Sequence, residues 1–388
     1  MIMEEVKTEA SKRLFIDMIA AVYEGNSTWV RPIDKDIEKV FDPLQNKYFS
    51  HGECTRWILW NSDKSKVIGR VAAFIDDRTK NATEQPTGGM GFFECIHDKE
   101  AAFKLMDTAK DWLKAKGMEA MDGPINFGER NQWWGLLVDG FDERPTYQMN
   151  YQQPYYKELF EAYGFQVYFY QYSYGLIVNQ PRPEKYMRIW NIMKTNKDYV
   201  FTNAKKNNLA KYAEDFRTIL NAAWAKHEGF REMTAEQSLK IMKMMKPIMV
   251  EHLMQFAYYK GKPIAMYINI PELNQYFQHV NGKLDWLGKL KTFYYQKTMK
   301  YQKFVGIVFG VIPEFQGKGL EGMMVMNLHD IIHDKDWYRD VEMSWIGDFN
   351  PKMMNICVQL GAKVIKTHAT YRYLFDRNIA FQRAPIIH

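Results

Sequence analysis

The spacing of apolar residues over the first 180 positions predicts alternating helices and strands. Between residues 12 and 24, apolar side chains recur every three or four positions, which is typical of an amphipathic helix. Runs rich in aromatic and β-branched residues predict strands. The predicted order is a helix at 12–24, a hairpin of Thr55–Trp60 and Val67–Ile75, a strand at Met90–Ile96, a helix at Lys99–Lys116, a strand at Met121–Phe127, a helix at Pro154–Tyr163 and an aromatic strand pair at Phe165–Val178.

The second half of the chain repeats this order of elements. Two copies of one α/β unit of about 170 residues explain the repeat, with domains at 1–180 and 181–388 and a boundary at the prolines that follow Asn179. The fold class is therefore α/β, with a mixed sheet of the α+β kind. The predicted elements are helices at 209–227 and 235–246, a hairpin of Phe256–Tyr259 and Ile264–Ile270, a strand at Phe304–Ile312, a helix at Gly317–Asp334, a strand at Val341–Ile346, a helix at Pro351–Leu360 and a strand pair at Lys363–Phe375.

The composition indicates a folded cytoplasmic protein. Apolar residues make up 46% of the 388 residues and aromatic residues 15%, enough to form a core. The three cysteines, Cys54, Cys95 and Cys357, are far apart, which argues against a disulfide scaffold or a zinc ribbon and favours a reducing compartment. We find no secretory leader and no run of 18 apolar residues. The net charge of +6 is too small for a nucleic-acid footprint but suits an anionic ligand.

The segment from Val308 to Gly322 gives the clearest chemical prediction. A buried strand runs into a glycine-rich turn at the start of an amphipathic helix. Free backbone N–H groups and the positive end of the helix dipole suit a pyrophosphate at such a corner. Lys318 adds a cation, and the glycines allow close approach of a ligand. The spacing matches neither the Walker loop nor the dinucleotide-binding fingerprint.

Two sequence elements resemble the GNAT (Gcn5-related N-acetyltransferase) superfamily. Gln316, Gly319 and Glu321 are similar to its acyl-CoA motif, with Gly322 one position late. Asn350 is followed after eleven positions by a glycine, which is similar to the second motif. The first half is similar to a degenerate copy without the pyrophosphate turn. The whole chain resembles a bacterial tandem-GNAT group of acyl-CoA N-acyltransferases, some of which are implicated in long-chain N-acylation in sphingolipid synthesis.

The resemblance implies an acyl-CoA co-substrate and an amine acceptor, with no metal. In that family, a strand pairs with the pantetheine arm, and one of its N–H groups stabilises the oxyanion. The residues implied to bind the acyl donor are Phe309, Gly310, Val311, Gln316, Gly317, Lys318, Gly319, Gly322 and Asn350.

Catalytic residues follow from the resemblance in the same way. A carboxylate, directly or through water, would take the proton of the amine, and Glu342, Asp348 and Glu314 are the candidates. Glu342 is the first choice because its strand should border the acyl cleft. The family's proton-donating tyrosine is replaced here by Cys357, so Cys357 itself, Tyr371 or Tyr373 is the candidate acid.

Other interpretations remain open at this stage. Glu321 would repel a pyrophosphate, and with Cys357 it favours a non-catalytic GNAT scaffold that binds acyl-CoA or a lipid. An aminoacyl-tRNA-dependent transferase is the other alternative, against which the mild charge argues. His329 and His333 have the spacing of a zinc pair but no third ligand, so we expect no metal.

The acceptor is expected to be a small-molecule or lipid amine, and nucleic acid is not an expected partner. Adjacent indoles at Trp133 and Trp134 suggest a domain-interface plug first, with an acyl pocket or a peripheral membrane contact as alternatives. The Met-rich run 241–254 is interpreted as packing against the sheet. The sequence does not fix the acceptor, the acyl length, the general acid or the oligomeric state.

Overall fold

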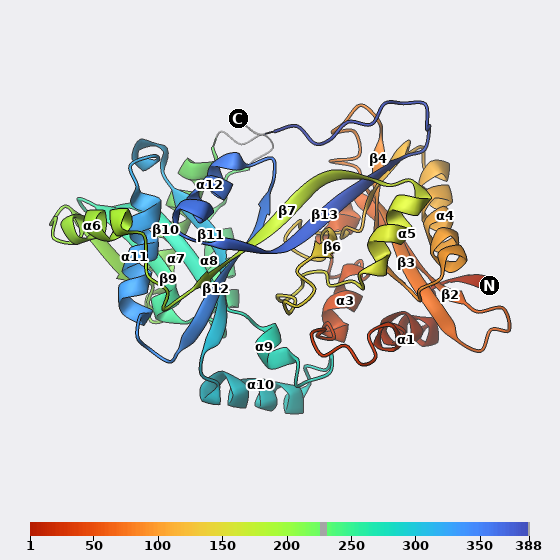
Figure 1. The fold of residues 1–388 in the computed structure, drawn as a ribbon, viewed down its shortest axis with the longest axis horizontal. Helices are drawn as coiled ribbons and strands as arrows, with labels where there is room; N and C mark the ends of the chain where they lie inside the picture. The colour runs from red at the N-terminus through yellow and green to blue at the C-terminus, as the bar shows by residue number, and fades with distance from the viewer. Residues whose placement is uncertain (226–230, 387–388) are drawn as a thin grey trace.

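One continuous mixed sheet organises the molecule. A computed structural model describes residues 1–225 and 231–386. Its strands follow the order β1-β2-β3-β4-β5-β13-β7-β12-β11-β10-β9-β8, and β6 pairs with β13 outside this path. Figure 1 shows the two halves of the chain side by side, with the long strands β7 and β13 crossing the middle. The sheet therefore belongs to both halves.

The first half forms a strongly twisted set of strands covered by helices. Local signals fix the helix starts: Thr8 and Ser11 form a capping box, and Asp98 accepts from the N–H of Ala101. The elements are β1 (Ile2–Glu5), α1 (Glu9–Asp17), α2 (Ile19–Val22), α3 (Asp34–Val40), β2 (Gly52–Trp60), β3 (Val67–Asp76), β4 (Thr87–Cys95), α4 (Lys99–Ala115), β5 (Ala120–Gly123), β6 (Leu136–Asp139), α5 (Tyr155–Tyr163) and β7 (Gln166–Ile177).

The second half repeats the plan and adds a helix and a strand before α7 and two helices between β10 and β11. These additions are α6 (Glu184–Met193), β8 (Tyr199–Asn203), α9 (Asn274–Phe277) and α10 (Trp286–Thr298). The remaining elements are α7 (Leu209–Trp224), α8 (Ala235–Met245), β9 (Met254–Tyr259), β10 (Lys262–Pro271), β11 (Gln302–Val311), α11 (Leu320–Ile332), β12 (Tyr338–Gly347), α12 (Pro351–Gln359) and β13 (Lys363–Leu374). Part of the helix expected at 209–227 falls outside the described residues.

The halves exchange strands at the centre of the sheet. β13, the last strand of the chain, lies between β5 and β7 and pairs antiparallel with both. β7, from the first half, pairs with β12 of the second half. The strand pairs expected at Phe165–Val178 and Lys363–Phe375 are wrong, because each segment is a single long strand. The division at residue 180 stays a prediction, and the exchange joins its two parts.

Separate apolar clusters lie above and below the sheet. One cluster in the second half packs α6, α11 and α12 on one face, and another packs α7 and α8 on the opposite face. Met242, Met249 and Met254 of the Met-rich run are buried in the latter, as expected. Trp133 is buried in a core cluster of the first half, against Phe92 with ring centroids 5.5 Å apart. It is therefore a core residue of that half rather than an exposed indole.

Candidate active site

A cleft opens where β11 and β12 separate. The two strands pair in parallel from Gln302 to Gly306, and no further pairing between them occurs in the described chain. Beyond Gly306, β11 keeps β10 as its partner, so its other edge faces a cavity of about 310 Å³. Since successive peptide groups of a strand point to alternate sides, this edge carries N–H and C=O groups available to a ligand.

A β-bulge interrupts β11 at the mouth of this separation. Ile268 pairs with Val308 and Asn269 pairs with Gly306, which leaves Ile307 as the extra residue. Bulges leave one residue outside the ladder and redirect its peptide groups. Ile307 lines the cleft, so the bulge places an irregular backbone segment beside the cavity. No local sequence pattern predicts this bulge, because a bulge depends on the register of two strands.

The predicted donor strand lines the cleft. Phe309, Gly310 and Val311 all border the cavity. Phe309 packs edge-on against Tyr267, with ring centroids 5.1 Å apart. A methyl group on Gly310 would approach the ring of Trp224 to 3.0 Å, so the glycine lets α7 pack closely against the strand. The three strand residues that were expected to bind the donor thus form part of the wall of the cleft.

The predicted pyrophosphate corner lies between β11 and α11. Gln316 closes the turn, because its Nε2 donates to the carbonyl of Val311 at 2.9 Å. Gly317 and Gly319 have φ angles of +70° and +80°, where a side chain is strained although the space around them is open. Gly319 is the N-cap of α11 and provides no side-chain cap. The first N–H groups of α11 therefore remain available to an anion.

Lys318, Glu321 and Gly322, which neighbour this turn, differ in burial and in their expected effect on an anionic ligand. Lys318 is exposed, with its ammonium 5.3 Å from the ring centroid of Phe315. Gly322 is buried, and a methyl group there would meet the ring of Tyr186 at 2.3 Å, so it is a packing position for α6. Glu321 is half-buried in the first turn, where its charge would oppose an anionic ligand.

Asn350 lies at the opposite wall of the cleft. Its Oδ1 accepts from the N–H of Met353 at 3.2 Å, so it caps α12. The residue also lines the cavity, together with Met353, Ile356 and Leu360. The cleft therefore borders the N-terminal end of α12, whose dipole favours negative charge, and reaches the turn before α11 at Gln316. Gly317, Lys318, Gly319 and Gly322 are not among the residues that line it.

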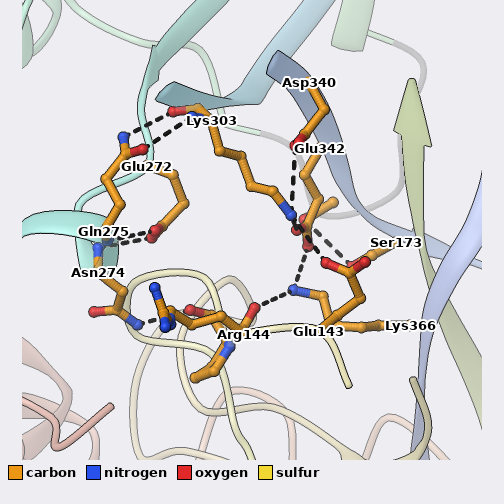
Figure 2. A network of polar contacts seen from close by, with 12 residues as sticks. Glu143, Arg144, Ser173, Glu272, Asn274, Gln275, Lys303, Asp340, Glu342 and Lys366 are labelled. Carbon is orange, nitrogen blue, oxygen red and sulfur yellow. Dashed lines mark hydrogen bonds and ion pairs between the residues drawn. The ribbon is translucent and has the colours of Figure 1, made fainter. Parts of the chain in front are cut away.

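Glu342 is buried in a network of charges between the halves (Figure 2). Its carboxylate pairs with the ammonium of Lys366 at 2.8 Å and that of Lys303 at 3.5 Å, and accepts from the hydroxyl of Ser344 at 2.9 Å. Burial alone would raise the pKa of Glu342, but the two lysines outweigh it and lower this pKa. Glu342 is thus ionised at neutral pH.

This network connects the cleft to a second cavity. Ser344 lines the cleft, whereas Lys303 lines a polar pocket of about 370 Å³. Other walls of the pocket come from both halves, since Glu143 and Arg144 belong to the first and Glu272 to the second. Lys303 also pairs with Glu143 at 3.2 Å. We call this cavity the polar pocket; Glu342 holds residues of both cavities in one network.

None of the three candidate acids is among the residues that line the cleft, and Tyr373 packs, like Tyr371, in the core of the first half. Cys357 is fully buried in the α11–α12 cluster and is not among the residues that line the cleft; burial raises its pKa to about 12. Tyr371 lies on β13 in the core of the first half, where its hydroxyl donates to Glu161 at 3.1 Å. Burial raises the pKa of Tyr371. The structure does not bring Tyr371 together with the donor strand.

Tyr267 on β10 is a cleft residue that the sequence did not indicate. It borders the cavity, and its hydroxyl lies 3.5 Å from the position a methyl group on Gly306 would occupy. Burial raises its pKa, and Cys357 raises it further. Tyr267 therefore lies close enough to Cys357 for the charges of the two groups to interact. A tyrosine inside a strand is commonplace, so the sequence carried no signal for it.

The first half has no equivalent cleft. A methyl group on Gly91 of β4 would lie 1.8 Å from the carbonyl oxygen of Ile125, so the segment after β5 closes onto β4. The cavity beside Phe92 and Trp133 is only about 30 Å³. Among residues 1–225 and 231–386, no group of three or more His, Cys, Asp or Glu side chains could hold a metal ion. None of the helices in those residues could cross a membrane.

Solved structures share this architecture along the whole chain. A tandem GNAT protein from the clavulanic acid biosynthesis pathway superposes with a TM-score of 0.56 and 11% identity, over 96% of this chain and 99% of that one. The chain has the tandem GNAT fold. The GNAT region of a fungal β-N-acetylglucosaminidase matches with a TM-score of 0.55 and 12% identity, over 96% of this chain and 38% of that one. The predicted mixed α/β fold and the predicted resemblance are confirmed.

Two curated proteins match this chain over nearly their full length. A bacterial ceramide synthase of Caulobacter vibrioides is 26% identical over 374 residues, which cover 94% of this chain and 95% of that protein. Protein YghO of Escherichia coli is 24% identical over 380 residues, or 92% of each chain. No family model matches the sequence. The relatives and structural neighbours support acyl transfer in general as the activity of this fold.

Proposed function

We propose that the protein is an N-acyltransferase that moves an acyl group from coenzyme A to an amine. The observation that carries this proposal is the cleft between β11 and β12, whose unpaired strand edge leads through Gln316 toward the uncapped N-terminus of α11. A thioester with a pantetheine arm and a pyrophosphate needs those two features at adjacent places. The similarity to a ceramide synthase agrees with this chemistry.

In the donor complex, the edge of β11 pairs with the pantetheine arm. The pyrophosphate lies at the turn of Gln316, Gly317 and Gly319, and Lys318 is close enough along the chain to add a cation. A backbone N–H at Ile307 would stabilise the oxyanion, because the bulge leaves this residue outside the hydrogen-bonded pairing of β10 and β11.

In the transfer step, the amine nitrogen attacks the thioester carbonyl and the carbon–sulfur bond breaks. The amine loses a proton and the leaving thiolate gains one. Glu342 would accept the proton of the amine through the polar network. The hydroxyl of Tyr267 would donate a proton to the leaving thiolate. Cys357 is the weaker choice as the donor, because it is not among the residues lining the cleft.

For the acceptor, we propose a lipid amine whose polar head lies in the polar pocket. Glu143, Arg144 and Lys303 surround this pocket with charges of both signs, which suits an amino alcohol carrying hydroxyl groups. Ceramide is the N-acyl product of such an amine, and a ceramide synthase is one of the relatives. The aromatic and methionine content is compatible with a long acyl chain but does not fix its length.

A calorimetric titration with acetyl-CoA, palmitoyl-CoA and free CoA tests the donor site, and release of CoA in the presence of long-chain amines tests turnover. Gly319→Glu should abolish donor binding, because it places a carboxylate at the pyrophosphate corner. Gly319→Asn is the matched control, since it imposes the same strained φ of +80° with a residue that tolerates it and adds no charge.

The affinity of the two variants tests the donor site, and the rate of thioester cleavage distinguishes an enzyme from a non-catalytic scaffold. Equal donor affinity in Gly319→Glu and Gly319→Asn would refute the assignment of the corner. Donor binding without any acceleration of thioester cleavage would instead favour the non-catalytic scaffold, for which Glu321 at the corner is the specific observation.

A further inference from the structure

Helix α10 carries its apolar side chains on the side that faces away from the protein. Five large side chains of this helix are between 50% and 69% exposed: Trp286, Leu287, Leu290, Phe293 and Tyr294. With 3.6 residues per turn, these five fall within one arc of about 120°. The opposite side, which faces the protein, contains the buried Gly288 and the half-buried Thr292. This arrangement is the reverse of an ordinary surface helix.

One ring contact holds α10 in this orientation, and two hydrogen bonds within the helix define its first turns. Asp285 caps the helix by accepting from the N–H of Gly288 at 2.9 Å. Thr292 donates back to the carbonyl of Gly288 at 2.8 Å. On the same inner side, Tyr295 stacks on His279 with ring centroids 3.7 Å apart. The helix therefore presents a fixed apolar face, which we call the α10 face.

Lysines border the α10 face. Lys289 and Lys291 lie at its two edges, and Lys297 lies within it, 5.7 Å from the ring centroid of Phe293. Within the described residues, no ion pair joins Lys289 or Lys291 to an acidic side chain, and the nearby Asp285 is engaged as the helix cap. The face combines bulky apolar groups with free positive charge.

We propose that the α10 face docks the protein on a membrane surface that contains anionic lipids. Trp, Phe and Leu on one side of a helix with flanking lysines suit the boundary between lipid headgroups and acyl chains, where lysine ammonium groups reach the phosphates. A second copy of the chain is a poorer occupant, since a two-fold contact would bring the lysines close to their own copies. Figure 1 shows α10 at the outer rim of the molecule, below the junction of the halves.

The position of α10 relates the membrane to the proposed acceptor site. Met299 and Tyr301, which follow α10 directly, line the polar pocket, and Tyr301 is itself 61% exposed. The chain then continues into β11 at the cleft. Docking would thus bring the mouth of the polar pocket near the headgroup layer. The docking proposal itself stands without the proposed function, because it concerns only the surface of the free protein.

Vesicle sedimentation with the full chain tests the proposal without any acyl donor. Phosphatidylcholine vesicles that contain phosphatidylglycerol should bind the protein, pure phosphatidylcholine vesicles should bind it more weakly, and salt should reduce binding. The double variant Trp286→Ser/Phe293→Ser should bind at least ~10-fold more weakly, because it removes the largest inserted groups. Lys289→Glu/Lys291→Glu should bind anionic vesicles at least ~10-fold more weakly.

Leu44→Ser is the matched control, since Leu44 is 95% exposed but lies far from α10 in the chain, near α3. It should bind vesicles like the unchanged protein, and all variants should keep the same far-ultraviolet circular dichroism. Failure of the unchanged protein to bind anionic vesicles would overturn the proposal. A dimer that is lost in the Trp286→Ser/Phe293→Ser variant, with no vesicle binding, would assign the α10 face to self-association instead. Donor binding measured separately by calorimetry would remain unaffected.

Discussion

At the scale of single residues, the proposed site depends on a buried carboxylate held by two cations. Glu342 is fully buried, and Lys366 is nearly so. Removing one partner of such a buried ion pair destabilises the fold strongly, because the remaining charge is buried without compensation. The same residue therefore supports the fold and is our candidate base, and loss of activity in a Glu342 variant is informative only beside a measurement of stability.

Glu342→Gln should lower the free energy of unfolding by about 3–5 kcal/mol, since it leaves the buried ammonium group of Lys366 without its ion-pair partner and removes one of the partners of Lys303. Urea unfolding measures this loss. Glu53→Gln is the control, because Glu53 pairs with Lys116 at 2.8 Å on the surface and should cost less than about 1 kcal/mol. Partial recovery of stability in Glu342→Gln/Lys366→Met would confirm that the unpaired charge is the cause. Equal effects of the two single variants would contradict the argument.

The hydroxyl of Tyr267 gives a separate prediction about chemistry. Tyr267→Phe should lower kcat about 100-fold while leaving donor affinity unchanged, because the leaving thiolate loses its proton donor but the cleft keeps its shape. Steady-state release of CoA measures kcat, and calorimetry measures donor affinity. Tyr174→Phe is the control, since Tyr174 is buried in the same cluster and does not line the cleft. Full activity in Tyr267→Phe would return the role of acid to Cys357 or to solvent.

At the scale of elements, β13 connects the halves through a buried histidine. His368 on β13 is buried, and its Nε2 donates to the carbonyl of Asn150 at 2.9 Å. Burial lowers the pKa of His368 to about 4, against 6.5 for the free side chain. The unfolded chain therefore binds a proton between pH 6.5 and pH 4 that the folded chain does not. The stabilisation is complete above pH 6.5 and is lost as the pH falls toward 4.

The loss of stability attributable to His368 should reach about 3 kcal/mol across this range. Urea unfolding at a series of pH values measures it, and His368→Gln is the reference because a glutamine amide still donates but does not titrate. His329, whose pKa is also lowered to about 4 by burial, is present in both proteins, so it cancels in the difference. Parallel curves for the two proteins would contradict the prediction.

Helices and hairpins that depend on local residues were predictable from the sequence. Helices with local signals, such as the cap at Asp98 before α4, and hairpins with polar turns, such as β2–β3, were predicted close to their observed bounds. The motif residues Gln316 and Asn350 both line the cleft, whereas Gly319 lies beyond its walls at the start of α11, and their common role in donor binding stays a prediction. The predictions of helices and hairpins succeeded because they depend on a few neighbouring residues.

What the sequence did not predict depends on distant partners. β7 and β13 were expected as strand pairs because both are long and rich in aromatic residues, and nothing local shows that they pair across the halves. Glu342 was predicted as a candidate base, but its partners Lys303 and Lys366 come from two other strands. The α10 helix was not predicted, because its apolar residues lie on the solvent side and alternate with lysines instead of forming a core-facing pattern.

At the scale of the whole molecule, the strand exchange makes the two halves dependent on each other. Without β13, β5 and β6 lose partners in the first half, and β7 loses one long edge. Without β7, β12 loses its antiparallel neighbour in the second half. Unpaired strands in the middle of a sheet leave many backbone groups unsatisfied, so neither half is expected to hold its native structure by itself.

Residues 1–180 and 181–388 expressed separately should therefore not unfold cooperatively, whereas the full chain should show one calorimetric transition with equal calorimetric and van't Hoff enthalpies. Mixing the two separately produced halves should restore the cooperative transition, because β13 and β7 can then find their partners. A chain ending at residue 362 tests the role of β13 more directly, because it keeps the residues that line the cleft and the polar pocket but lacks β13. Its unfolding should lose cooperativity in both the first and the second half. Independent cooperative melting of residues 1–180 would show that the first half folds without β13, and the exchange would then be a late docking step rather than part of one folding unit.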